Sequence, residues 1–516
     1  MPLFGGLVMI EHFFMKPEVR GELMERVLLN AARLCSGIYR PNAIYTQDKN
    51  GWPGDWEGRT ILALVSHMKA LEREPAYLRE IIRDIPEHLN EKGYLGKVLP
   101  DGVFDEQQLS GHNWLLSGLV EYEYLSGDEH VLQMIKSIVS NLYLPLTGYY
   151  KTYPLDPEIR KTGGSFSGTV SSRVGSWILS TDIGCAFMCL DGLSRYYELY
   201  RDKKVLKLLS EMISVFKKID FVGTHMQTHA TLSAVRGILK LYKVTSKKEY
   251  LDVAESVFEL YKTCGMTENY ANFNWFGRFD TWTEPCAITD SLIVATDLYI
   301  LTEKISYLKL AARIYYNAFC YAQRYNGGFG TDKTVGPAGK YLSPAGPGIS
   351  EAYWCCTMRG AEGLAYLCEN SALVKKNYDV IVPFGGSFTV HSMEYRLDFE
   401  SRIPYEDTFD VKVLALKDVS FKILVLGEED LEEFHVDAKK GEKFHLSGKI
   451  SISHHDESAF TVEGKKHFYG NLLLGTPNLT LNREGVSDDE NALRPLTDMK
   501  DVMPENIKGE GRQIVF

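Results

Sequence analysis

The feature that most constrains the fold is a repeated helix–hinge–helix pattern. Short polar hinges follow Tyr124, Tyr200, Tyr242 and Leu301, and each separates an apolar helix from an amphipathic one. The hinges recur roughly every 45–75 residues, which is typical of stacked helical hairpins. The apolar periodicity predicts helices at 17–36, 59–71, 75–92, 111–126, 129–144, 180–200, 203–218, 226–244, 248–263, 286–302, 304–322 and 359–373. Twelve helices in six hairpins predict an (α/α)6 barrel, with an open α-solenoid as the alternative.

The pattern changes from helical to alternating after about residue 376. Short runs rich in β-branched and aromatic residues follow, including 409–414 and 419–425. We therefore predict a mostly α protein with a β domain: the barrel over residues 1–375, a small β-sandwich over 376–480, and a loosely packed tail over 481–516. A chain of 516 residues is too long for one ordinary core, which agrees with this division.

Composition and net charge limit the kinds of ligand and surface that the protein is expected to bind. The net charge of −11 argues against a nucleic-acid or anionic-membrane surface and is compatible with a neutral ligand such as a sugar. The N-terminal stretch has no basic region, and Glu11 and His12 interrupt its apolar run, so we predict no signal peptide and a cytoplasmic protein. Without an apolar run of 18 residues, no membrane span is expected. Nine cysteines without an export signal favour reduced thiols or metal ligands.

Four residues have the chemistry of a soft-metal site. Glu284 and Cys286 lie two apart, and Cys355 and Cys356 are adjacent. Three thiolates and a carboxylate can bind one ion tetrahedrally, most plausibly zinc, if the backbone turns at each pair. Pro285 favours this because it disfavours the helical conformation at Glu284. The alternative is four unrelated residues, with the cysteine pair buried as small apolar side chains.

The same stretch offers a catalytic pair for cleaving a glycosidic bond. A zinc-bound thiolate is deprotonated at neutral pH and can attack an anomeric carbon. A carboxylic acid across the sugar ring would protonate the leaving oxygen and then activate water. We assign Cys355 as the nucleophile and Glu268, 16 residues before Glu284, as the acid/base. The alternative for Glu268 is a surface carboxylate near a helix end.

Several motifs in one order resemble the β-L-arabinofuranosidase family, glycoside hydrolase family 127, and its clan. The most specific are Glu284-Pro285-Cys286-Ala287 and Trp354-Cys355-Cys356, the latter followed by a helix that begins near Arg359. Glu268 lies at the family's acid/base spacing. Weaker matches are His225 to Ala230, Ser110 to Trp114, and Phe468 to Leu473. The chain departs from the family at Pro285, in an altered histidine segment, and in a short β domain.

The resemblance covers about residues 50–475 and implies an (α/α)6 barrel with a β-sandwich, a site of three thiolates and one carboxylate for Zn2+, and retaining hydrolysis. For substrate contacts we predict His112, with His225 or His229, from the family motifs. Trp56 and Trp282 are added because each lies in a loop rich in aromatic and charged residues, and such loops often line pockets.

The leading hypothesis is therefore a cytoplasmic, zinc-dependent retaining glycosidase with a cysteine nucleophile that acts on short oligosaccharides, with a homodimer as the candidate assembly. Two alternatives stay open: a sugar epimerase or lyase on the same barrel, and a non-catalytic carbohydrate-binding protein with a structural zinc. An epimerase or lyase would not need Cys355, and a structural site would use all four ligands to hold the fold.

Overall fold

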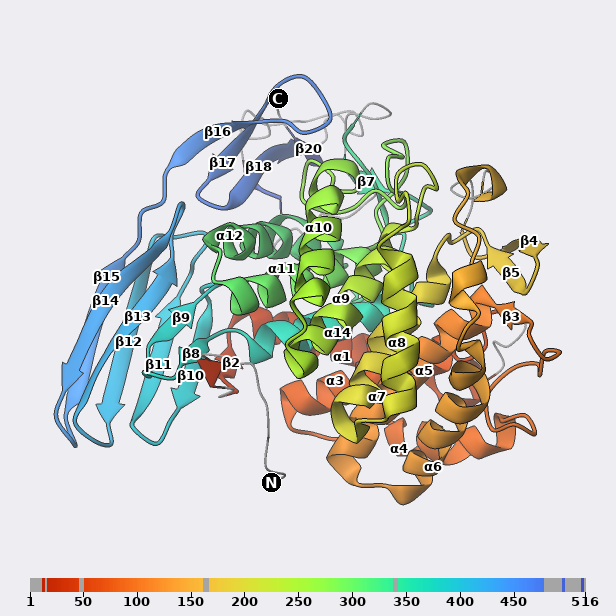
Figure 1. Cartoon of the computed structure of the whole chain (residues 1–516). Coiled ribbons are helices and arrows are strands. Elements are labelled where there is room, and N and C mark those ends of the chain that lie inside the picture. The colour runs from red at the N-terminus through yellow and green to blue at the C-terminus, as the bar shows by residue number, and fades with distance from the viewer. Residues whose placement is uncertain are drawn as a thin grey trace.

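The protein combines a large helical body with a smaller β region at one side (Figure 1). The computed structural model describes residues 12–13, 16–45, 51–160, 167–336, 342–477, 494–496 and 512–514. Within these residues the twelve longer helices are α1 (Glu22–Leu34), α3 (Asp55–Leu71), α4 (Leu78–Asp84), α5 (Glu106–Ser126), α6 (Glu129–Ile138), α7 (Cys189–Tyr200), α8 (Lys203–Phe216), α9 (Thr228–Thr245), α10 (Lys248–Cys264), α11 (Pro285–Thr302), α12 (Ile305–Ile314) and α14 (Cys356–Glu369). Two short helices, α2 (Pro41–Ile44) and α13 (Cys320–Ala322), complete the set.

Each predicted segment contains a helix, but several differ in extent. In the segment predicted at 75–92, α4 covers only Leu78–Asp84 and a 3-10 turn follows, and the segment predicted at 129–144 ends in a π-helical turn at Val139–Tyr143. The segment predicted at 180–200 begins only at Cys189, because strand β5 (Trp177–Ser180) and a left-handed turn at Gly184 precede it. The segment predicted at 304–322 is continuous but contains a π-helical turn at Tyr315–Phe319 between α12 and α13.

The hinges have a common backbone cause. Five helices end on a residue with left-handed φ, which stops the helix and reverses the chain. The outer helix of the hairpin starts a few residues later, and in two hairpins an aspartate side chain caps it: Asp128 accepts from His130 N, and Asp202 accepts from Lys204 N. The residues with left-handed φ are Glu72, Gly127, Arg201, Ser246 and Glu303.

The helices pack in two layers with a cyclic order of contacts. Six helices form the inner set, in which each helix packs against the next and the last returns to the first: α3, α5, α7, α9, α11 and α14. Each inner helix also packs against one further helix: α4, α6, α8, α10, α12 and α1, respectively. The first five of these follow their inner helix in sequence, whereas α1 comes from the start of the chain and packs on α14.

Burial follows these two layers. Helix α8 buries one face only, as its amphipathic sequence predicts, whereas α11 is buried along nearly its whole length. Among the described residues, α11 is also the one helix long and apolar enough to cross a membrane, yet 83% of its apolar window is buried inside the protein. Its apolar character is explained by its central position.

The β region contains two five-stranded sheets around one apolar core. The first has the order β1-β8-β9-β13-β14, and the second β15-β12-β11-β10-β2. Strand β12 shows why they pack: its buried and exposed residues alternate, so one face of the strand contributes to the core. The bounds are β1 (His12–Phe13), β2 (Glu18–Arg20), β8 (Leu373–Lys375), β9 (Val380–Val382), β10 (Ser387–His391), β11 (Tyr395–Ser401), β12 (Thr408–Ala415), β13 (Val419–Leu426), β14 (Leu431–Ala438) and β15 (Lys443–Lys449).

Segments on both sides of residue 375 cross the predicted boundary between the helical and β regions. Strands β1 and β2 come from the N-terminal segment but pair with β8 and β10 of the β region. Conversely, β16 (His454–Ser458), β17 (Lys465–Tyr469) and β18 (Leu472–Pro477) leave the two sheets and pack on the helical body, where Phe468 and Leu473 join its core. Most of the predicted tail lies outside the described residues; its described parts, β19 (Arg494–Pro495) and β20 (Arg512–Ile514), pair with β18.

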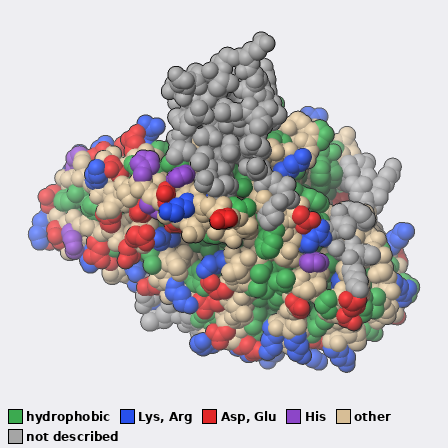
Figure 2. Space-filling model, turned by 90° about the horizontal axis from the view of Figure 1, so that it is seen from above, with side chains coloured by type: hydrophobic (Ala, Val, Ile, Leu, Met, Phe, Trp, Pro, Cys, Tyr) green, Lys and Arg blue, Asp and Glu red, His purple; other side chains and the backbone are tan. Residues whose placement is uncertain are grey.

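Smaller sheets lie at the edge of the helical body. They are β3 (Phe104–Asp105) with β5 and β4 (Val170–Val174), and β6 (Asp332–Lys333) with β7 (Ser343–Pro344). Seen from above, acidic and basic side chains are interspersed over the described surface, and histidines gather at its β-sheet end (Figure 2).

The close approach of α3 and α5 depends on Gly58. A Cβ atom at this position would lie 2.0 Å from the backbone nitrogen of Leu115, so the two helices can touch only because the side chain is missing. We predict that Gly58→Ala forces the helices apart and lowers the free energy of unfolding by roughly 1–3 kcal/mol or more, as overpacking does in a dense core. Chemical denaturation would measure the change.

The matched control is Gly37→Ala, because nothing lies within 4 Å of a Cβ there. Equal stability of the Gly58→Ala protein and the control would contradict this account of the helix packing.

Candidate metal centre and active site

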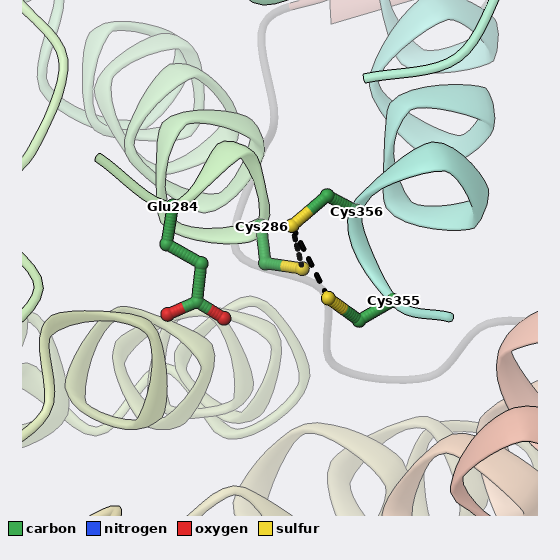
Figure 3. Close-up of side chains that lie close together, drawn as sticks. All are labelled: Glu284, Cys286, Cys355 and Cys356. Carbon is green, nitrogen blue, oxygen red and sulfur yellow. Dashed lines mark hydrogen bonds between the residues drawn. The ribbon is translucent and has the colours of Figure 1, made fainter. Parts of the chain in front are cut away.

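The four residues predicted as metal ligands lie together. Single ligand atoms of Glu284, Cys286, Cys355 and Cys356 all fall within 4.8 Å of one another (Figure 3). The sulfur of Cys356 is 3.5 Å from that of Cys286 and 3.2 Å from that of Cys355. All nine cysteines of the chain are free of disulfides.

Two helix N-termini build this cluster. Glu284 is the N-cap of α11 in an extended conformation, with φ −125° and ψ 109°, and Pro285 starts the helix. Cys355 is the N-cap of α14, and Cys356 is its first residue. The backbone therefore turns at each pair, as one shared ion requires. The positive ends of both helix dipoles also face the anionic ligands and favour the thiolate form.

The donor set fits a divalent soft metal. Zinc–sulfur bonds of about 2.3 Å in a tetrahedron place the sulfurs roughly 3.8 Å apart. The observed separations of 3.2 and 3.5 Å are close to that value, so small side-chain adjustments suffice for tetrahedral binding. These residues would hold the ion by three sulfurs and one carboxylate oxygen.

The three sulfurs are not electrostatically equal. Hydrogen bonds from Cys286 and Cys356 lower the pKa of Cys355 to about 5, whereas burial raises the pKa of Cys286 to about 11. The Arg59 guanidinium, whose Nη1 lies 3.6 Å from the Cys286 sulfur, adds positive charge near the cluster. Cys355 is thus the sulfur that these surroundings hold most readily as a thiolate.

A pocket with a volume of about 160 Å3 opens on one side of the cluster. Cys355 and Glu284 line it, while the side chains of Cys286 and Cys356 are fully buried behind them. A pocket of this size suits a small ligand. The other lining residues are Trp52, Asp55, Trp56, Glu57, Arg59, Ser110, Ser167, Gly168, Asp182, Met188, Gln227, His229 and Trp354.

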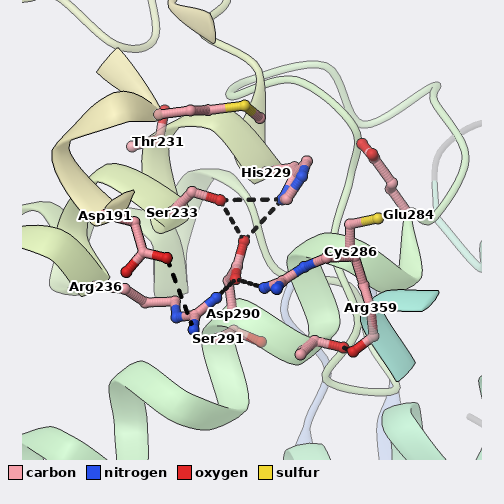
Figure 4. A network of polar contacts seen from close by, with 12 residues as sticks. Asp191, His229, Thr231, Ser233, Arg236, Glu284, Cys286, Asp290, Ser291 and Arg359 are labelled. Atoms are coloured by element: carbon pink, nitrogen blue, oxygen red, sulfur yellow. Dashed lines mark hydrogen bonds and ion pairs between the residues drawn. The ribbon is translucent and has the colours of Figure 1, made fainter. Parts of the chain in front are cut away.

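His229 is fixed in the wall of the pocket. Its Nδ1 lies 2.7 Å from Oδ2 of Asp290 (Figure 4). Its ring stacks on Trp114 at a centroid distance of 5.5 Å. Because Asp290 holds Nδ1 as the donor, Nε2 is left as the acceptor, and it faces Arg59 Nη2 at 3.4 Å.

Asp290 belongs to a buried network of ion pairs between residues of α7, α9, α11 and α14. Burial opposes its charge, but Arg359, His229 and Arg236 together hold the pKa of the carboxyl well below its usual range. Arg236 Nη1 donates to Asp290 Oδ1 at 2.8 Å, and Arg359 Nη2 donates to the same oxygen at 2.5 Å. Glu362 pairs with both of these arginines and extends the network to Arg195. Paired charges of this kind fix side-chain positions at a substantial desolvation cost.

The predicted substrate-binding residues divide into two groups. Trp56 and His229 line the pocket. His112 does not: its Nε2 accepts from Leu95 N, its Nδ1 bonds to Gln108 O, and burial lowers its pKa to about 4. His225 bonds to the carbonyl of Phe276, and Trp282 packs against a neighbouring tryptophan, also outside the pocket lining. We therefore do not propose these three as substrate contacts.

The structure places Glu268, the predicted acid/base, outside the pocket lining. Its carboxylate is fully buried and accepts from Phe460 N at 2.7 and 2.9 Å and from both Thr461 N and Thr461 Oγ1. Lys466 Nζ, also fully buried, pairs with it at 3.2 Å. Glu268 is not among the pocket-lining residues, because the segment that leads into β17 folds back over it. The residue holds the C-terminal strands on the helical body.

The sequence prediction missed three residues near the cluster: Arg59, Asp182 and Asp290. Asp290 follows Cys286 by four residues, so it lies on the same face of α11, and a charged residue in such an apolar helix is a usable signal. Arg59 follows Asp55 by one turn and pairs with it. Asp182 gives no comparable signal, because only the folded chain brings it to the pocket.

Comparison with solved structures shows the fold. The chain superposes on a glycoside hydrolase with a TM-score of 0.60 at 13% identity, covering 91% of this chain and 83% of the other. The superposition on a GH127 beta-L-arabinofuranosidase from Geobacillus stearothermophilus T6 has a TM-score of 0.60 at 11% identity. It covers 96% of this chain and 93% of the other. The superposition on a further GH127 beta-arabinofuranosidase has a TM-score of 0.58 at 13% identity, and it covers 88% of this chain and 80% of the other. No protein-family model and no curated protein sequence matches the chain.

These likenesses define the class of fold: this chain is built like the GH127 arabinofuranosidases over most of its length, as the motif resemblance predicted.

A measurement of stability can distinguish a structural role of Glu268 from an acid/base role. Glu268→Gln leaves Lys466 buried without its counter-charge, so the free energy of unfolding should fall by roughly 3–5 kcal/mol. The double variant Glu268→Gln/Lys466→Met should recover much of this loss, because the unpaired charge is removed. Urea denaturation would measure both proteins. Unchanged stability in the single variant, together with lost turnover, would instead favour the acid/base role.

Proposed function

We propose that this protein is a retaining glycoside hydrolase of the β-L-arabinofuranosidase type, with Cys355 as its nucleophile. The proposal depends on one observation: a sulfur of the four-ligand cluster lines a pocket. The other walls of this pocket carry aromatic, cationic and carboxylate side chains. The shared fold of the GH127 enzymes supports the same assignment.

The choice of Cys355 follows from access. A nucleophile must reach the anomeric carbon, and Cys355 is the one sulfur of the cluster that lines the pocket. Its placement at the start of α14 and its lowered pKa favour the thiolate, which is the reactive form. Attack would form a thioglycosyl intermediate on Cys355, and water would then release the sugar with retained configuration.

Zn2+ is the ion we propose for Glu284, Cys286, Cys355 and Cys356, since these donors and their spacing suit it. When bound, the ion keeps the sulfurs deprotonated at neutral pH and fixes their positions.

We propose that the pocket holds a single sugar ring. Trp354 is half exposed beside Cys355, and with Trp56 it offers apolar faces on which a ring can stack. His229 Nε2 and Arg59 offer hydrogen bonds to hydroxyl groups. The small volume favours the terminal sugar of a short oligosaccharide or simple glycoside.

The cyclic contacts of the six inner helices support our proposal that the helical body is an (α/α)6 barrel with the pocket at one rim. Cytoplasmic location and a homodimer stay predictions from the sequence.

A structural zinc site in a carbohydrate-binding protein is the second candidate. Four protein ligands are typical of structural sites. The access of Cys355 and Glu284 to the pocket argues against it, because a purely structural centre gains nothing from exposure to a ligand.

We predict about one zinc per chain in the purified protein, as for other four-ligand sites. Cys286→Ser should lower the zinc content and the thermal stability together, because metal binding contributes to folding. Cys264→Ser is the matched control, since Cys264 lies outside the cluster. Elemental analysis and thermal denaturation measure both quantities, and an active enzyme without metal would contradict the proposal.

Cys355→Ser should abolish turnover of nitrophenyl glycosides, with a loss of at least three orders of magnitude in kcat, because the weaker serine nucleophile cannot replace a thiolate. Circular dichroism should show an unchanged fold. A screen of aryl furanosides and pyranosides would identify the sugar, and product NMR would establish the stereochemistry. Loss of zinc and fold with residual turnover in the surviving protein would favour the structural site.

A further inference from the structure

Glycosidic cleavage by Cys355 needs a group that protonates the leaving oxygen, and Glu268 is not placed to supply it. The pocket lining contains four carboxylates: Asp55, Glu57, Asp182 and Glu284. Glu284 is a ligand of the proposed metal. Asp55 directs both oxygens to Arg59 Nε at 2.9 Å, which holds it as a paired anion. Glu57 and Asp182 remain as sources of a proton.

Hydrogen bonds hold the Asp182 carboxyl group in place without neutralising its charge. Ser167 Oγ donates to its Oδ1 at 2.7 Å, and Gly168 N donates to its Oδ2 at 3.1 Å. Both donors are uncharged, and within the described part of the chain no Lys, Arg or His forms an ion pair with it. The residue is 5% exposed, so its remaining access is through the pocket.

The backbone around Asp182 ties it to the metal centre. It follows β5, and its own nitrogen donates to Ser180 Oγ at 3.1 Å. The carbonyl of the next residue, Ile183, accepts from Gln227 N at 3.0 Å. The Gln227 side chain then donates to Oε2 of the metal ligand Glu284 at 3.3 Å. Asp182 and the cluster thus line one pocket and are joined by a hydrogen-bonded path through Gln227.

We infer that Asp182 is the general acid/base of the proposed glycosidase. The inference rests on the proposed function. In the first step the Cys355 sulfur bonds to the anomeric carbon, the bond from that carbon to the leaving oxygen breaks, and the Asp182 proton passes to that oxygen. In the second step water bonds to the anomeric carbon, its proton returns to the Asp182 carboxylate, and the carbon–sulfur bond breaks with its electron pair returning to Cys355. The sum is hydrolysis of one glycoside by one water.

Burial and the neighbouring carboxylates make Asp182 easier to protonate than an ordinary aspartate. Burial raises the pKa of Asp182 to about 6, despite the hydrogen bonds from Ser167 and Gly168. The titratable groups that interact with it are three carboxylates and one thiol: Glu106, which pairs with Arg160, Asp55, which pairs with Arg59, Glu284, and Cys185. Since an acid acts in its protonated form, kcat/KM should fall as the pH rises through this pKa.

The test compares two glycosides of the sugar that the wild-type enzyme turns over, one with a dinitrophenyl leaving group and one with an alkyl leaving group. Asp182→Asn should lower kcat/KM on the alkyl glycoside by roughly 10²- to 10⁴-fold and change it little on the dinitrophenyl glycoside, which leaves without a proton. The alkaline limb of the wild-type pH profile should disappear. In Asp182→Ala, azide should speed turnover of the dinitrophenyl substrate and yield a glycosyl azide of retained configuration.

Asp156→Asn is the matched control, because Asp156 is exposed and outside the pocket. Zinc content and thermal stability check that each variant is folded. Equal losses of Asp182→Asn on both substrates, no loss on either, or a leaving-group dependence in Glu57→Gln instead would overturn the inference. Absence of any glycosidase activity in the wild-type enzyme would refute the proposed function itself, which is a separate result.

Discussion

The repulsion among four anionic ligands is the constraint around which the centre is organised. If the three thiols and the carboxyl group that lie within 4.8 Å of one another were all ionised, they would carry four negative charges. Each pair repels by about 4 kcal/mol at an effective dielectric constant of 20, or roughly 24 kcal/mol over six pairs. A helix dipole offsets at most about 2 kcal/mol, so the N-termini of α11 and α14 do not suffice. The arrangement is stable either when Cys286 and Cys356 stay protonated and hydrogen-bond to Cys355, or when a divalent cation is bound, and the cation is the state that holds all three sulfurs as thiolates.

The same helices connect the centre to the interior. Helix α11 supplies Glu284 and Cys286 at its start and Asp290 one turn later, where Asp290 orients His229 toward the pocket. Helix α14 supplies Cys355 and Cys356 and then Arg359, which also binds Asp290. One ion-pair network thus fixes the relative position of the two helices that carry the ligands and of the histidine in the pocket wall. The cost of burying these charges is explained if the geometry of the site depends on them.

Local sequence patterns predicted the parts of this structure that depend on local physics. The helices, their hinges and the turn at Glu284 all follow from side-chain periodicity and from Pro285, and the structure contains them. The cluster was predictable because donor chemistry limits which residues can share an ion. The surroundings of Glu268 were not predictable, because its partner Lys466 is nearly two hundred residues away and the spacing to Glu284 carries no information about which side a loop faces. Asp182 was missed for the same reason, since its partners Ser167 and Gly168 come from a separate loop.

The central claim is that the Cys355 sulfur bonds to the sugar during turnover. The most direct measurement is acid quenching of the enzyme during steady-state turnover of a dinitrophenyl glycoside, followed by peptide mass spectrometry. We predict one added glycosyl group on the peptide that contains Cys355 and Cys356. Fragmentation of this peptide should locate the glycosyl group on Cys355. A glycosyl group on another residue, or turnover without any covalent adduct even when the second step is slowed, would contradict it.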